Sequence, residues 1–374
     1  MRFSADDEAF RSRVRDWLEA NVPAELRGAG GPGREHEAFG ERREWNRRLA
    51  VAGWTCLSWP AEFGGRDATL AQQVIFHEEY ARAQAPARVA IVGEELAGPM
   101  IGAFGTPELK RRFLPPIRAV DELWCQGFSE PGAGSDLASV TTSAVLDNGT
   151  WVISGQKVWT SLAHVADWCF VLARTEPGSK RSAGLSMLLV PMRQPGIAVR
   201  PIRQLTGTSE FNEVFFDTAR TDAANVVGGT GDGWRVATAT LAIERGAAML
   251  GQQVGFRREF DALAAIAPDD PLVRNQLARA WIGLQVMRAY ALDTLDDDTD
   301  SGAPSVLKIL WSRWYRDFGE LAMRVRGAPS MVLRDDRDPW QRLFLFSRAA
   351  TIYGGSEEIQ RNIIARRALG LPRS

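Results

Sequence analysis

The spacing of hydrophobic residues along these 374 residues changes twice, from helical to strand-like and back to helical. The order of these three zones constrains the fold more than any other feature. Up to about residue 117, apolar side chains recur at helical spacing, as Phe10, Val14 and Leu18 do. From about residue 121 to 227, short runs rich in β-branched and aromatic residues alternate with turn signals such as Asp147-Asn148-Gly149. After about residue 233 the helical period returns. We therefore expect an α+β fold, mostly α, without the βαβ alternation of a doubly wound sheet.

These zones predict three domains, which are an N-terminal helical domain over residues 1–118, a middle antiparallel β domain over 119–228 and a C-terminal helical domain over 229–374. Within them, helices are expected over residues 37–52, 69–85, 108–117, 234–264, 272–295 and 305–326. Strands are expected over residues 140–146, 150–153, 168–174, 185–191, 198–203 and 212–217.

The composition argues against several classes of function. The formal net charge is −1, so the chain lacks the excess of positive charge that would attract nucleic acid. No apolar run is long enough to cross a bilayer. The first residues lack the basic stretch and apolar core of a signal peptide, so a cytoplasmic protein is expected. Cys56, Cys125 and Cys169 are odd in number and far apart, which favours reduced thiols. The three histidines have no metal-ligand spacing, so no metal site is expected.

The segment over residues 128–136, FSEPGAGSD, carries the strongest local signal. Its turn-forming residues can bring the backbone close to a ligand, and the hydroxyls of Ser129 and Ser135 can donate hydrogen bonds to that ligand. A tight loop at the entrance to the β domain would explain the same composition. The segment alone leaves both interpretations open.

A second segment, GQKVWTS over residues 155–161, places an aromatic side chain before two hydroxyls. Trp159 could form a wall against a planar heterocycle, and Thr160 and Ser161 could donate hydrogen bonds to its edge. A strand with a buried core tryptophan is the alternative interpretation.

Glu244 lies in a third segment, LAIERGAAM, over residues 241–249. On a helix it would share a face with Leu241, Ala247 and Ala248, which are small or apolar. An acid on such a face is uncommon unless it is paired or functional. A buried ion pair between this glutamate and an arginine remains the alternative.

A fourth segment, over residues 352–366, contains two glycines that interrupt the last helical stretch at Gly354-Gly355. Ser356 is expected to be the N-cap of the following helix, with Glu357 and Glu358 in its first turn. The alternative is a structural corner between two helices.

In this order, the four segments resemble those of the acyl-CoA dehydrogenase family. The segments FGTPELKRRFLPPI over residues 104–117 and FNEVFFD over residues 211–217 extend the resemblance nearly from end to end. Several motifs with matching spacing are more specific than any single one. The resemblance implies the family fold, with an N-terminal helical domain, a middle β domain and a C-terminal four-helix bundle.

The resemblance also implies an FAD cofactor and an acyl-CoA substrate. The residues implied to bind the cofactor are Gln126, Phe128, Ser129, Gly134, Ser135, Trp159, Thr160, Ser161, Ser356 and Glu358. The residues implied to bind the substrate are Ser135, Arg245, Tyr353, Gly355 and Arg366. In the family reaction a carboxylate removes the α-proton of the thioester, and the β-hydride passes to the flavin. An electron-transfer flavoprotein is the expected electron acceptor.

The catalytic base departs from the usual family pattern. Most members carry it in a Tyr-Glu-Gly motif, where this chain has Tyr353-Gly354-Gly355. A minority, including isovaleryl-CoA dehydrogenase, place it before an arginine on the first long helix of the bundle, and Glu244-Arg245 resembles that arrangement. The resemblance implies Glu244 as the base and the backbone N–H of Gly354 as a donor to the thioester oxygen. The missing side chain at position 354 leaves room for a branched or bulky acyl group.

Two further departures concern the assembly. The family segments Arg-x-x-Phe-Gly and Gly-Gly-x-Gly, which reach the FAD of a neighbouring subunit, are not matched around residues 256–280 and 326–331. The chain resembles actinobacterial members, several of which are α2β2 heterotetramers that act on steroid side-chain thioesters. A homotetramer, a partner subunit that completes a shared FAD site, and an acyl group bound to acyl carrier protein are the open alternatives.

Overall fold

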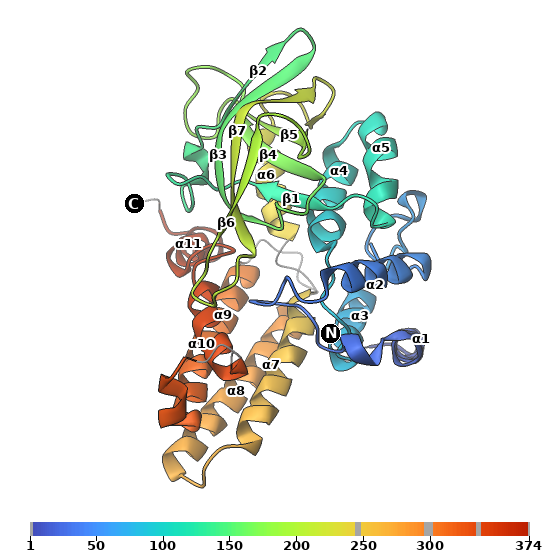
Figure 1. The fold of residues 1–374 in the computed structure, drawn as a ribbon. Coiled ribbons are helices and arrows are strands. Elements are labelled where there is room, and N and C mark those ends of the chain that lie inside the picture. Colours follow the sequence, from blue (N-terminus) through green and yellow to red (C-terminus); the bar gives the residue numbers. More distant parts are fainter. Residues whose placement is uncertain (1–2, 244–247, 295–301, 334–337, 373–374) are drawn as a thin grey trace. The chain divides into compact units, whose positions relative to one another are not determined.

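The computed structural model describes residues 3–243, 248–294, 302–333 and 338–372. The chain forms two compact units, each built from segments that are distant in the sequence. The sheet unit comprises Gly28–Ala68 and Pro86–Glu244, and the helical unit comprises Met1–Arg27, Thr69–Ala85 and Arg245–Ser374. Figure 1 labels the helices and most of the strands. The domain limits expected from the sequence, after residues 118 and 228, remain a prediction.

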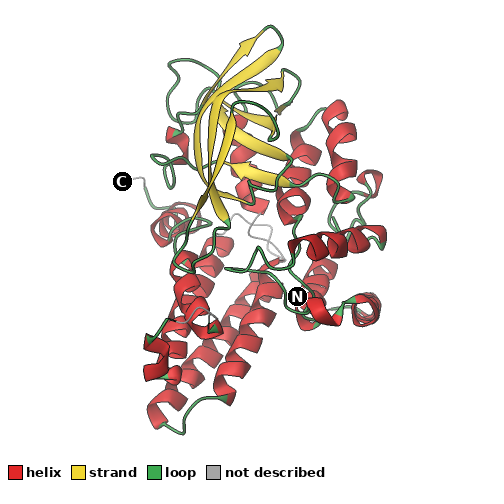
Figure 2. Ribbon diagram, viewed as in Figure 1, coloured by secondary structure: helices red, strands yellow, loops and turns green. Residues whose placement is uncertain are grey.

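An eight-stranded sheet dominates the sheet unit (Figure 2). Seven strands follow the order β6-β7-β3-β2-β4-β5-β8, and β1 pairs with β4 in parallel. The strands are β1 Trp124–Gly127, β2 Ser143–Asp147, β3 Thr150–Ser161, β4 Trp168–Arg174, β5 Leu185–Pro191, β6 Ile197–Ile202, β7 Phe211–Asp222 and β8 Val226–Val227. The main pairings are antiparallel, as expected. The parallel pairings both involve β4. It pairs with all four residues of β1, and it pairs with β2 at a single position, Ser143 with Arg174.

The hairpin between β2 and β3 turns at the predicted signal. Asn148 has a φ of 48° and Gly149 a φ of 78°. The two-residue hairpin turn whose twist matches that of the flanking strands requires a positive φ at both central residues. The side chain of Asn148 also donates a hydrogen bond to Asp147 at 2.9 Å.

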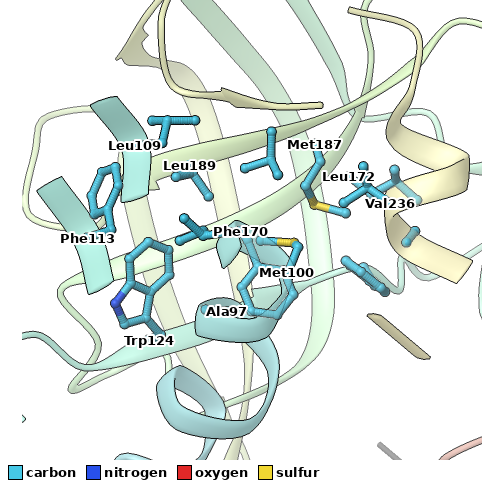
Figure 3. Close-up of a cluster of buried hydrophobic side chains, with 14 of the residues drawn as sticks. Ala97, Met100, Leu109, Phe113, Trp124, Phe170, Leu172, Met187, Leu189 and Val236 are labelled. Atoms are coloured by element: carbon cyan, nitrogen blue, oxygen red, sulfur yellow. The ribbon is translucent and has the colours of Figure 1, made fainter. Parts of the chain in front are cut away.

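The sheet unit also contains helices. They are α2 Phe39–Val51, α4 Gly98–Phe104, α5 Pro107–Arg118 and α6 Gly233–Ile243, with a π-helical turn at Gly93–Ala97. Among them, α4, α5 and α6 pack against the sheet. Figure 3 shows Phe113 of α5 against Trp124, with ring centroids 5.4 Å apart, and Val236 of α6 beside Leu172 and Met187. Burying each such side chain contributes about 1.5–3 kcal/mol, which holds α5 and α6 on the sheet.

The helical unit contains the predicted bundle. Its helices are α1 Ala5–Asn21, α3 Leu70–Arg82, α7 Ala248–Ala265, α8 Pro271–Thr294, α9 Ala303–Arg326, α10 Pro339–Ala350 and α11 Glu357–Ile363. Capping boxes begin α1, at Ser4, and α3, at Thr69. Helices α7 to α10 pack around an aromatic core in which Phe256 stacks on Tyr315 at 4.8 Å. Within the described residues, no helix is long and apolar enough to span a membrane.

Candidate active site

Two of the segments singled out in the sequence meet in the sheet unit through a buried ion pair. The ammonium of Lys157, on β3, lies 2.9 Å from a carboxylate oxygen of Glu130. The same ammonium donates to the carbonyl oxygens of Phe128 at 3.0 Å and Leu172 at 2.7 Å. The backbone N–H of Val158 also donates to the carbonyl of Ser129 at 2.9 Å. These bonds fix the loop over residues 128–136 against β3.

Glu130 is held as a carboxylate. It accepts hydrogen bonds from the backbone N–H and hydroxyl of Thr141, at 2.7 and 2.8 Å, and from the N–H of Thr142 at 2.9 Å. Burial by itself would raise the pKa of Glu130, but Lys157 and these donors outweigh burial and lower the pKa to about 2. Burial lowers the pKa of Lys157, and the Glu130 carboxylate opposes that shift. The pair is therefore a charged anchor beneath the loop.

Trp159 stands in a strained turn of the same strand. Its φ is +60°, and the register of β3 against β7 shifts between Lys157 and Thr160, which marks a β-bulge. A left-handed conformation costs a non-glycine residue roughly 1–2 kcal/mol. Because of the bulge, the indole is 58% exposed whereas Thr160 is buried. The backbone thus presents a large aromatic face at the surface of the sheet unit.

Unpartnered polar atoms lie in the residues predicted to line the cofactor. The hydroxyl of Thr160 and the amide nitrogen of Gln126 are buried and have no hydrogen-bond partner among the described residues. Buried polar groups are nearly always hydrogen-bonded, so each has capacity for a partner beyond the described residues. A flavin, with polar atoms on the edge of a planar ring, would supply such partners.

The remaining predicted residues of the sheet unit differ in accessibility. Ser129 and Ser161 are half-buried, Phe128 is buried, and Gly134 and Ser135 are exposed. The loop is closed by reciprocal backbone hydrogen bonds of 3.0 Å between Glu130 and Ala133. Its tip is therefore available for contacts made from outside the unit.

The helical unit holds the glycine turn predicted after α10. Gly354 has a φ of +65° and Gly355 a φ of +92°, both in the region that favours glycine. A Cβ at 355 would collide with the Gln360 amide, whereas a Cβ at 354 would make an ordinary contact with Lys308, at 3.7 Å. Among the described residues, a Cβ at position 354 therefore clashes with nothing, but the positive φ disfavours any residue other than glycine there.

Ser356 is the N-cap residue of α11, as predicted, but its side chain makes no capping bond to the helix backbone. Hydrogen bonds to its own backbone N–H and to Ser356 lower the pKa of Glu358. Glu357 forms an ion pair with Arg313 at 2.6 Å. Tyr353 is more than one-third exposed and Arg366 is exposed. Glu244 and Arg245 lie outside the described residues.

A buried lysine supports the glycine turn and was not foreseen from the sequence. Lys308, on α9, is 7% exposed and donates to the carbonyl of Ala350 at 2.7 Å. Its ammonium lies 4.0 Å from the ring centroid of Trp311 and 4.6 Å from that of Tyr353. The sequence offered one hint, which is that lysine is rare in this chain. Two of its four lysines, Lys157 and Lys308, are buried.

We predict that Lys308→Met lowers the free energy of unfolding by about 1–3 kcal/mol, because the carbonyl of Ala350 loses a charged donor in a buried setting. Urea denaturation measures this change. Lys180→Met, at an exposed position, is the matched control and is expected to remain within about 0.5 kcal/mol of wild type. Equal stability of the Lys308 and Lys180 variants would contradict a supporting role for Lys308.

The described residues also bear on the simpler predictions. Cys56, Cys125 and Cys169 are free and buried, as expected for reduced thiols. The described part of the chain contains no group of three or more His, Cys, Asp or Glu side chains that could hold a metal ion.

Comparison with known proteins connects these features to one family. The N-terminal, middle and C-terminal domain models of acyl-CoA dehydrogenases match residues 4–121, 125–219 and 231–369. Acyl-CoA dehydrogenase IpdE1 of Mycobacterium tuberculosis is 62% identical over 98% of each chain. The Tcur3481-Tcur3483 steroid ACAD superposes with a TM-score of 0.87 at 29% identity, covering 100% of this chain and 99% of that one.

The ChsE4-ChsE5 complex from Mycobacterium tuberculosis has a TM-score of 0.84 at 29% identity, with both chains covered completely. The three matching domain models account for nearly the whole chain, as does the high identity to a named relative. The chain therefore belongs to the acyl-CoA dehydrogenase family, the flavoprotein oxidoreductases that act on the CH–CH bond of acyl-CoA.

Proposed function

We propose that this chain binds FAD and dehydrogenates a bulky, steroid-derived acyl-CoA, with Glu244 as the base that removes the α-proton. Two observations carry the FAD assignment, namely the unfilled hydrogen-bond capacity of Gln126 and Thr160 and the exposure of Trp159. Bound FAD would supply the acceptor for the β-hydride. The residues of the chain hold that cofactor, orient the thioester and move the proton.

In this proposal the residues named from the sequence hold the cofactor and the substrate. Trp159 provides the ring wall, and Ser129, Thr160 and Ser161 donate to the polar edge of the flavin. Gln126, Phe128, Gly134 and Ser135 complete this side, and Ser356 and Glu358 meet the adenosine side. Ser135, Arg245, Tyr353, Gly355 and Arg366 are proposed to contact the substrate. The anchored loop supports this assignment, because the Glu130–Lys157 pair limits the movement of Ser129.

The assignment of Glu244 as the base follows from what position 354 lacks. Gly354 carries no carboxylate, while its N–H remains available to donate to the developing enolate oxygen. Glu244 shares its predicted helix face with small and apolar residues, and desolvation there would raise its affinity for a proton. The lack of a side chain at 354 supports a bulky acyl group, as does the similarity to a steroid ACAD.

Thr160→Val is expected to weaken FAD binding by about 2- to 10-fold, which corresponds to the loss of one hydrogen bond. Because the Thr160 hydroxyl has no partner within the described chain, the variant should not lose stability in the absence of FAD. Fluorescence titration of FAD measures the affinity. Thr221→Val is the matched control, because the buried Thr221 hydroxyl donates to Leu189 at 2.6 Å and should affect stability but not FAD affinity.

If the FAD assignment is correct, the protein with bound FAD is yellow. We expect a flavin spectrum that is bleached anaerobically by a steroid-derived acyl-CoA. We further propose an α2β2 assembly, supported by the similarity to the named complex ChsE4-ChsE5. A chain that becomes yellow only when produced with a sister chain supports this assembly. A chain that binds no FAD with or without such a partner contradicts the proposed function. Electron-transfer flavoprotein is proposed as the acceptor that reoxidises the enzyme.

A further inference from the structure

A cavity of about 370 Å³ opens within the helical unit among α3, α7 and α8. Each helix contributes three residues at the same spacing, i, i+1 and i+4, and the third is always an arginine. The residues are Glu78, Glu79 and Arg82 of α3, Gln253, Val254 and Arg257 of α7, and Leu284, Gln285 and Arg288 of α8. None of them belongs to the proposed flavin or thioester site. Three guanidinium groups from three helices therefore converge on one space.

The inner wall of the cavity contains an unsatisfied amide. Gln253 is 4% exposed, and among the described residues neither its amide oxygen nor its amide nitrogen has a hydrogen-bond partner. An unsatisfied buried polar group is destabilising, and native proteins retain few of them. Leucine or methionine would fill such a helix position without that cost. The retained amide indicates a partner that the described residues do not provide.

The carboxylates of the cavity are already neutralised. Glu78 lies 3.0 Å from Arg11 and 2.6 Å from Arg288. Glu79 lies 2.9 Å from Arg15 and 2.7 Å from Arg82. Both acidic side chains are nearly inaccessible. They therefore balance the arginines around them and offer little to a cation from outside.

The guanidinium groups retain donors that no described residue uses. Arg257 donates to Asp261 through Nε alone, at 2.9 Å, and lies over the Trp281 ring at 4.0 Å. Its two terminal nitrogens have no acceptor among the described residues. Arg288 makes one ion-pair contact, through Nη2. A guanidinium has five N–H donors and its planar fork fits carboxylate and phosphate oxygens. The cavity thus has a surplus of donors over acceptors.

We propose that this cavity is a binding site for a small organic anion that carries a carboxylate or phosphate group. Arg257 and Arg288 hold the anionic group, and a polar group of the same ligand satisfies the Gln253 amide. The volume is equivalent to roughly ten water molecules, so it accommodates an organic molecule rather than a bare ion. Half-exposed arginines at the mouth give access, while the inner wall of Gln253 and Leu284 is buried.

The first test compares probes on the protein as purified with FAD. Glucose 6-phosphate and succinate provide the two anionic groups, and glucose and sodium chloride at equal ionic strength are the controls. At about one hundred times Kd, an anion that binds here should raise the melting temperature by several degrees. A rise with either anion supports the site and identifies the preferred group. No rise beyond that with glucose and chloride overturns the proposal.

The second test locates the binding by substitution. Arg257→Gln should weaken the anion about tenfold, as expected for one charge-assisted contact. Arg279→Gln is the matched control, because Arg279 is exposed on α8 and does not line the cavity. Gln253→Leu should raise the melting temperature without ligand and reduce the rise that ligand causes. This opposite pair of effects distinguishes a binding residue from a structural one. Unchanged affinity in both the Arg257 and Gln253 variants overturns the proposal.

Discussion

Glutamine in place of Glu244 is expected to slow reduction of the flavin by acyl-CoA by about 10²- to 10⁴-fold, with FAD content unchanged. The amide has nearly the same shape as the carboxylate but cannot accept the α-proton. Anaerobic stopped-flow absorbance of the flavin band measures the step directly, separately from turnover. Glu176→Gln, at an exposed position of the sheet unit, is the matched control and should retain the wild-type rate. Wild-type rates in fully loaded Glu244→Gln would exclude Glu244 as the base.

A second substitution, made in the Glu244→Gln variant, tests whether a carboxylate at position 354 can replace the base at 244. Gly354→Glu restores the carboxylate at the position that most family members use. A Cβ there would lie 3.7 Å from Lys308 without a clash among the described residues, but a φ of +65° costs roughly 1–2 kcal/mol. The nearby ammonium would stabilise the ionised carboxylate and weaken it as a base. We therefore expect partial recovery, and only with a small acyl group, because the new side chain takes up room that glycine leaves.

The sequence predicted the fold best where local pattern and burial agree. The runs at 168–174 and 185–191 became β4 and β5 with the same limits, because nearly every residue in them is apolar and buried. The run at 150–153 was too short. β3 continues to Ser161, because the bulge at Trp159 preserves pairing with β7 through residues that break the alternating pattern. The parallel pairing of β1 with β4 could not be predicted, since nothing local to either strand specifies its neighbour.

The candidate site was predicted as separate motifs, and the contacts between them were not. Ser129, Trp159 and Ser356 were proposed from residue type and spacing, which a single sequence displays. The ion pair that joins two of the motifs connects residues 130 and 157, and no periodicity links them. Lys308 was missed for the same reason, because its partners Ala350 and Tyr353 lie in another helix and the turn that follows it. Residue chemistry is thus visible in the sequence, whereas long-range pairing is a property of the folded chain.

The ion pair beneath the loop leads to the largest expected effect on stability. Glu130→Gln leaves the Lys157 ammonium fully buried without its counter-charge, and breaking a buried pair in this way costs about 3–5 kcal/mol. Chemical denaturation at pH 7 measures the loss. Glu108→Gln, at a fully exposed position, is the control and should have a small effect. A loss below about 1 kcal/mol would show that the pair is not an anchor.

The pH dependence identifies the cause of that loss. In wild type, the lowered pKa of Glu130, about 2, contributes stability that is present above the unfolded value of about 4.3 and disappears as pH falls towards 2. Glu130→Gln lacks this contribution. Its buried Lys157 favours the neutral form, so unfolding binds a proton and the variant should gain stability as pH rises from 7 towards 10. Glu130→Gln/Lys157→Met has no such lysine and should lack this gain. If both variants respond equally to alkaline pH, an unpaired Lys157 is not what destabilises Glu130→Gln.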